Sequence, residues 1–128
     1  MDTMDTMDTM NQYKKITESL KLLSLSFEEQ LKCFSEFVEV PFEVIDTFDN
    51  AVLQLPSLIE TGKLDKTAIA SILRLQNMIN FTSSNPNFKD LDDEQFKLSD
   101  EWNKVREVAR DTLQIMGESL GKPDPNYI

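Results

Sequence analysis

The sequence predicts an all-α fold, a single-domain bundle of about five helices with short loops. Apolar residues recur at helical spacing in several segments, and no segment shows the strict alternation of a half-buried strand. The 128 residues include only 3 glycines and 5 prolines, too few for the frequent turns of an all-β chain. A chain of this length is the size of one domain and buries enough surface for a core.

The first ten residues are a literal repeat, MDTMDTMDTM, and differ from the rest of the chain. Three Met-Asp-Thr units carry no apolar face that could be buried against a core. We therefore expect residues 1–10 to be a disordered extension, and residues 11–128 to form the helical domain.

Two helices are expected at the start of this domain. Residues 11–23 have one apolar face, formed by Tyr13, Ile16, Leu20 and Leu23. A second helix is expected from Ser26, because a serine followed three residues later by Glu29 matches a capping box. This helix should end near Glu39, since Pro41 disfavours α geometry at the residue before it.

A third helix is expected from Pro41, because the missing N–H of a proline costs nothing in the first helical turn. Pro56 should break or kink it, and a short helical turn closed by Gly62 should follow. The apolar face of the third helix consists of Phe42, Ile45, Phe48, Val52 and Leu55.

The fourth helix is expected over residues 66–81, with Asp65 as its N-cap. This segment is apolar nearly all round, and such a helix usually lies in the middle of a bundle. A loop should follow over residues 82–90.

The C-terminal part should contain a short helical turn and a long last helix. The turn is expected to begin at Asp92 and to end near Lys97, and Ser99 should cap the last helix. The apolar stripe of this helix runs to Leu120, so we expect it to end at Gly121. The final residues, DPNYI, are expected to be exposed or loosely docked.

The residue types needed for most catalytic sites are missing. The chain has no histidine and one cysteine, Cys33, so it lacks a Ser-His-Asp or Cys-His arrangement and the ligands of a structural zinc site. Three scattered glycines cannot form a phosphate-binding loop. Paired carboxylates remain available for acid–base chemistry, but no pattern in the sequence places two of them in a cleft. We expect neither enzymatic activity nor a cofactor.

One acidic segment partly matches a calcium-binding loop. The EF-hand positions 1, 3, 5 and 12 would be taken by Asp90, Asp92, Glu94 and Glu101. Position 6 of that loop requires glycine, and Gln95 occupies it. We therefore expect a solvated acidic turn and no metal site.

The composition also indicates a compartment. A lone cysteine fits a reducing environment, the acidic N-terminus does not resemble a signal peptide, and no apolar stretch approaches the ~20 residues that span a bilayer. We expect a cytoplasmic protein without a membrane partner. The formal net charge of −10 disfavours direct binding of nucleic acid.

The excess of acidic residues is concentrated in two windows. Residues 26–62 hold eight acids and one base, and residues 90–101 hold six acids and one base. In the second window the acids lie at expected helix N-termini, where carboxylates interact favourably with the helix dipole. For the first window two interpretations stay open, a solvated face and a partner-binding surface.

Within the first window the acids are expected to form a stripe on the third helix. Glu43, Asp46 and Asn50 share a face at spacing i, i+3, i+7, and Asp49 lies beside Asp46. Glu36 and Glu39 lead into this face from the second helix. Like charges at this spacing repel, so the stripe is either a solvated face or a binding surface for a basic partner. The candidate partner-binding residues are Glu36, Glu39, Glu43, Asp46, Asp49 and Asn50.

Residues 26–120 resemble a known class of proteins. The resemblance rests on the runs LSFEEQLKCFSEFVEVPFEVIDTFDNAV, LIETGKL and DLDDEQFKLSDEWNKVREVARDTLQIMG, and above all on Glu-Trp-x-x-Val-Arg-x-x-Ala-Arg from Glu101 to Arg110. These segments resemble small acidic helical immunity proteins of bacterial polymorphic and contact-dependent growth-inhibition toxin systems. The resemblance implies neutralisation of a cognate toxin domain, often a basic nuclease, inside the producing cell. Toxin-facing surfaces vary among immunity proteins, so no binding residue can be transferred by position.

Two functions therefore remain open. The first is a non-enzymatic immunity protein that binds a basic toxin with electrostatic assistance. The alternative is a helical adaptor or structural module that docks through an apolar groove. Association with a partner should depend strongly on salt in the first case and weakly in the second.

Overall fold

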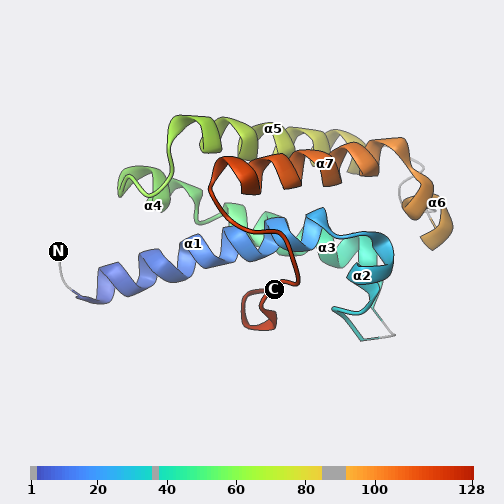
Figure 1. The fold of residues 1–128 in the computed structure, drawn as a ribbon, viewed down its shortest axis with the longest axis horizontal. Coiled ribbons are helices and arrows are strands. Elements are labelled where there is room, and N and C mark those ends of the chain that lie inside the picture. The colour runs from blue at the N-terminus through green and yellow to red at the C-terminus, as the bar shows by residue number, and fades with distance from the viewer. Residues whose placement is uncertain (1–2, 36–37, 85–91) are drawn as a thin grey trace.

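The computed structural model describes residues 3–35, 38–84 and 92–128, and this part of the chain is helical without any strand (Figure 1). The prediction of an all-α bundle is therefore confirmed. The helices are α1 (Thr3–Ser24), α2 (Phe27–Leu31), α3 (Val40–Val52), α4 (Leu55–Glu60), α5 (Lys66–Ser83), α6 (Asp93–Leu98) and α7 (Asp100–Ile115), and a 3₁₀ turn, η2 (Pro125–Tyr127), follows them.

Helix α1 is the element against which the others are arranged. It packs against α3 on one side and α7 on the other, and it also contacts α4 and η2. Helix α7 packs in turn against α5, so that α5 and α7 lie side by side above α1 in Figure 1. One continuous core runs through these contacts, with Leu20 of α1, Phe48 of α3, Leu75 of α5 and Leu113 of α7 fully buried.

Local N-cap hydrogen bonds, from a backbone N–H to a side chain three residues earlier, mark the predicted helix starts. Ser26 accepts from the backbone N–H of Glu29, Asp65 from that of Ala68, and Ser99 from that of Trp102. At α6, Asp92 and Gln95 form a reciprocal capping box. Each cap satisfies a backbone donor that the first helical turn leaves without a partner.

Two helices end in the same glycine motif. After α4, Gly62 has φ 70° and the N–H of Lys63 donates to the carbonyl of Leu58 at 3.0 Å. After α7, Gly117 has φ 75° and the N–H of Glu118 donates to the carbonyl of Leu113 at 2.9 Å. These are Schellman motifs, which require a residue that tolerates positive φ. Gly62 was predicted to end its helix, whereas the last helix ends before Gly117 and not at Gly121.

Two further boundaries differ from the sequence-based expectation. Helix α2 ends at Leu31, well before Glu39, because the chain turns there so that Cys33 and Phe34 pack against the core. Helix α1 begins at Thr3 and includes residues 3–10, which were expected to be disordered. Once α1 is nucleated by its packed part, each added residue gains a hydrogen bond without a new nucleation cost. Thr9 within the repeat is buried.

The position of α5 also differs from the expectation. Because α5 is apolar on nearly all sides, it was predicted to lie in the middle of the bundle. In the described part of the chain α5 instead packs mainly against one helix, α7. The side of α5 that points away from α7 exposes Leu73 and Phe81.

An aromatic cluster ties the short helices to α7. The ring of Phe96 in α6 meets Phe27 of α2 edge-on at 5.7 Å and lies 4.9 Å from the ring of Trp102 in α7. The guanidinium of Arg106 lies 5.0 Å from the centre of the Phe96 ring. Such contacts between rings and with a cation add to the burial of apolar surface.

We predict that Phe96→Ala lowers the free energy of unfolding by about 3 kcal/mol or more, because it leaves a cavity in this cluster. Phe96 is 1% exposed, whereas Phe81 is 80% exposed and provides the matched control. Phe81→Ala should change the free energy of unfolding by less than about 0.5 kcal/mol. Urea denaturation of both variants measures the difference, and equal losses would contradict this role of the cluster.

Candidate functional site

The predicted acidic stripe lies on the solvent side of α3. The opposite side of the helix is held in the core by Val44, Phe48 and Val52, which fixes the rotation of α3 about its axis. Three of the predicted residues, Glu43, Asp46 and Asn50, line one surface hollow of about 450 Å³.

The other predicted site residues lie outside this hollow. Glu39 is the exposed N-cap residue of α3, and its side chain makes no capping hydrogen bond. Asp49 lies on the exposed side of α3 but does not line the hollow. Glu36 lies outside the described residues. The stripe predicted from sequence is therefore partly assembled into one site by the fold.

The remaining wall of the hollow was not predicted. It comes from Lys15 of α1 and from the C-terminal residues Asn126, Tyr127 and Ile128. A second polar hollow, of about 500 Å³, shares Lys15, Asn126 and Tyr127 with the first. We call the first the acidic hollow. We call residues 123–128 the strap; its residues Asn126 and Tyr127 line both hollows.

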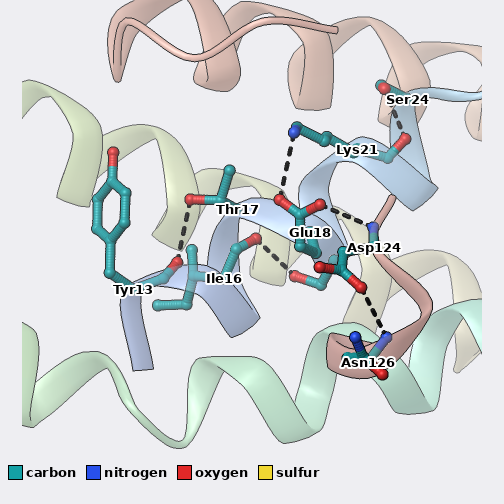
Figure 2. Close-up of polar contacts among 9 residues, drawn as sticks. Tyr13, Ile16, Thr17, Glu18, Lys21, Ser24, Asp124 and Asn126 are labelled. Carbon is teal, nitrogen blue, oxygen red and sulfur yellow. Dashed lines mark hydrogen bonds and ion pairs between the residues drawn. The ribbon is translucent and has the colours of Figure 1, made fainter. Parts of the chain in front are cut away.

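The strap is docked more firmly than the sequence suggested. Its backbone N–H at Asp124 donates to Oε1 of Glu18 at 2.8 Å, and Glu18 is only 3% exposed (Figure 2). Within the strap, the side chain of Asp124 accepts from the N–H of Asn126 at 3.0 Å. Pro123 is buried, and the hydroxyl of Tyr127 donates to Asn11 at 3.5 Å. A buried carboxylate on α1 thus positions one wall of the acidic hollow.

Glu18 also pairs with a base of its own helix. Nζ of Lys21 lies 3.3 Å from Oε2 of Glu18, an ion pair without the alignment of a hydrogen bond (Figure 2). A buried carboxylate without such partners would be costly, so both contacts contribute to keeping this charge in place.

The carboxylates of the stripe have no such compensation. The ion pairs among the described residues are Lys21–Glu18, Lys32–Glu29 and Lys97–Glu28, and none of them includes an acid of the stripe. Lys15 lines the acidic hollow, and none of the ion pairs among the described residues includes it. Partial burial, and then the charge of Asp46, raise the pKa of Asp49. The stripe therefore presents an excess of negative charge toward solvent, with Lys15 as a nearby base that forms no ion pair with it.

The hollow places two carboxylates, those of Glu43 and Asp46, in one cleft, which the sequence did not predict. Asp49, whose pKa is raised, is not among the residues that line this cleft. The arrangement can accept hydrogen bonds from a cationic or amide-bearing group. In the described ranges there is no cluster of three side chains that could hold a metal ion.

The residues missed by the sequence analysis come from distant parts of the chain. Lys15 and Tyr127 are brought together only because the strap folds back on α1. Glu18 is a charged residue within a helix, and nothing in the neighbouring sequence indicates that its side chain is buried and holds the strap.

No protein-family model matches this chain, and no similar curated protein or solved structure was found. Among the helices of the described residues, none is both long and apolar enough to cross a membrane.

We predict that Glu18→Ala lowers the free energy of unfolding by about 1 to 3 kcal/mol, because the N–H of Asp124 loses its acceptor. Hydrogen exchange at residues 123–128 should accelerate in this variant. Glu29→Ala removes an exposed ion pair and should cost less than about 1 kcal/mol without affecting the strap. A strap that stays protected in Glu18→Ala would contradict the anchoring role.

A second prediction concerns the pH dependence of stability at Asp49. Because its pKa is raised on folding, the folded state binds the proton more tightly, and stability is lost as the pH rises from about 3.9 through the folded pKa. Asp49→Asn should therefore be stabilising near neutral pH and neutral in acid. Asp46→Asn should bring the pKa of Asp49 closer to its ordinary value. Carboxyl titration by NMR measures this, and an unshifted pKa of Asp49 in the parent chain would contradict it.

Proposed function

We propose that this protein is a non-enzymatic inhibitor that binds a basic protein, and specifically an immunity protein that neutralises a nuclease-type toxin in the cytoplasm of the producing cell. The observation that carries the proposal is the acidic hollow with its adjoining stripe. There, Glu43, Asp46 and Asp49 present carboxylates that form no ion pair within the described chain, and Lys15 lines the same hollow as Glu43 and Asp46.

The geometry suits capture of cationic side chains. A lysine or arginine of the partner would enter the acidic hollow between α1 and α3 and donate hydrogen bonds to the carboxylates of Glu43 and Asp46. Charge-assisted hydrogen bonds of this kind are shorter and stronger than neutral ones. The side-chain amide of Asn50, which lines the same hollow, would add an uncharged hydrogen bond to the partner.

The net charge of the protein supports the same partner. A formal charge of −10 attracts a basic protein over distances greater than direct contact and raises the association rate. A nuclease carries a basic surface because it binds phosphates, so a carboxylate-bearing inhibitor can occupy that surface in place of the nucleic acid. The resemblance to acidic helical immunity proteins is consistent with this partner.

The alternative function is a helical adaptor that docks through an apolar groove. It is favoured by a separate observation, the exposed apolar side chains of Leu73 and Phe81 on α5. The two functions differ in how association should respond to salt, because charge-driven binding is screened and apolar burial is not.

We predict that reversing the charge at both Asp46 and Asp49 to lysine weakens binding to a basic partner by at least about tenfold, because the attraction and the hydrogen bonds are lost together. The partner to test is the protein encoded by the neighbouring open reading frame, in pull-downs at low and high salt. Binding by the parent chain should weaken as salt increases.

The matched control is Glu107→Lys with Asp111→Lys, which changes the net charge equally at exposed positions of α7. This control should keep most of the affinity. Equal affinity of both double variants would contradict the assignment of the stripe, and binding that is indifferent to salt would favour the adaptor function.

A further inference from the structure

Helix α5 has two apolar faces, and the bundle uses only one of them. Its inner face is buried in the core through Ala68, Ile72, Leu75 and Ile79. Its outer face lines an open hollow of about 620 Å³ formed by Ala70, Leu73, Arg74, Asn77, Met78 and Phe81. We call these six residues the outer α5 face.

The outer α5 face leaves large apolar side chains in contact with water. The side chain of Phe81 is 80% exposed and that of Leu73 is 43% exposed. Leu73, Asn77 and Phe81 follow each other at i, i+4 and i+8, which places them in one row along the helix. Asn77 separates the two apolar side chains within this row, and Ala70 and Met78 extend the apolar surface in the same hollow. An exposed apolar patch usually marks an interaction site.

The charge of α5 is opposite to that of the rest of the protein. Its 18 residues include Lys66 and Arg74 but none of the 23 acidic residues of the chain. Arg74 lies within the outer α5 face, and no ion pair in the described ranges includes it. The face therefore combines an apolar row with an unneutralised cation.

We propose that the outer α5 face is a second docking surface, which binds an amphipathic helix of another protein with an apolar stripe flanked by carboxylates. The apolar stripe would pack along Leu73 and Phe81, as ridges pack into grooves between helices. A flanking glutamate or aspartate would pair with Arg74.

The charges argue against two other occupants. A second copy of this chain would bring Arg74 near another Arg74 and would bring together two molecules of charge −10. An anionic membrane would repel the same net charge, and two cations on α5 are too few for stable attachment. An amphipathic helix with a few carboxylates carries far less charge than a second copy of this chain or an anionic membrane, so the repulsion it meets is weaker. At physiological salt, screening reduces this repulsion further, while Arg74 lies directly beside the docked helix.

The proposal can be tested with two synthetic peptides of about 20 residues, a length that supports helix formation. One carries leucines along a single face with glutamates on both sides of that face, and the other carries glutamine in place of every glutamate. Fluorescence anisotropy with the full chain should show saturable binding of the glutamate peptide and weaker binding of the glutamine peptide. Leu73→Ser with Phe81→Ser should weaken binding of the glutamate peptide by at least about tenfold.

Arg74→Gln tests the charge pairing separately. It should weaken binding of the glutamate peptide and leave binding of the glutamine peptide unchanged. Asp46→Asn with Asp49→Asn on α3 should leave both unchanged, so that failure here is distinguishable from failure of the proposed function. Since the substituted α5 residues are exposed, thermal unfolding should confirm that each variant remains folded.

Four results would overturn the proposal. The first is the absence of saturable binding, and the second is equal affinity for both peptides. The third is a dimer of the parent chain that dissociates in the Leu73→Ser, Phe81→Ser variant, and the fourth is binding of the parent chain to anionic vesicles that this variant abolishes. The third result would identify a second copy as the occupant, and the fourth would identify a lipid surface.

Discussion

The structure depends on the burial of the middle of α1. Residues 16–20 are all buried, although three of them, Thr17, Glu18 and Ser19, are polar. The hydroxyl of Thr17 donates to the carbonyl of Tyr13 at 3.0 Å (Figure 2). The hydroxyl of Ser19 donates to the carbonyl of Ile16 at 2.8 Å. The carboxylate of Glu18 requires partners beyond its own backbone, and it finds them in Lys21 and the N–H of Asp124. The strap and one wall of the acidic hollow therefore follow from a single buried charge.

Local signals predicted the parts of the fold that local interactions determine. The caps at Ser26, Asp65 and Ser99 need only a side chain and a nearby N–H, so their residue types suffice to place helix starts. The end of α2 and the docking of the strap depend on distant parts of the chain, and no local pattern could indicate them. For the site, the spacing of Glu43, Asp46 and Asn50 correctly predicted a shared face. It did not predict Lys15 or Tyr127, because only tertiary contacts bring those residues to α3.

The order of packing separates two surfaces of opposite chemistry. Helices α3 and α5 lie at opposite ends of the series α3, α1, α7, α5, in which each helix packs on the next. The exposed side of α3 is acidic and uncompensated, whereas that of α5 is apolar and carries only cations. In this arrangement a partner on α3 and a partner on α5 would not compete for the same surface. The inhibitor and the adaptor functions are thus compatible in one molecule.

A basic partner is proposed to bind where α3 and the strap form the acidic hollow. Hydrogen exchange of the full chain, with and without the protein encoded by the neighbouring open reading frame, tests this claim. Bound partner should slow exchange in residues 40–52 and 123–128 and leave residues 66–83 unaffected. Slowed exchange confined to residues 66–83 would contradict the claim and would place the partner on α5.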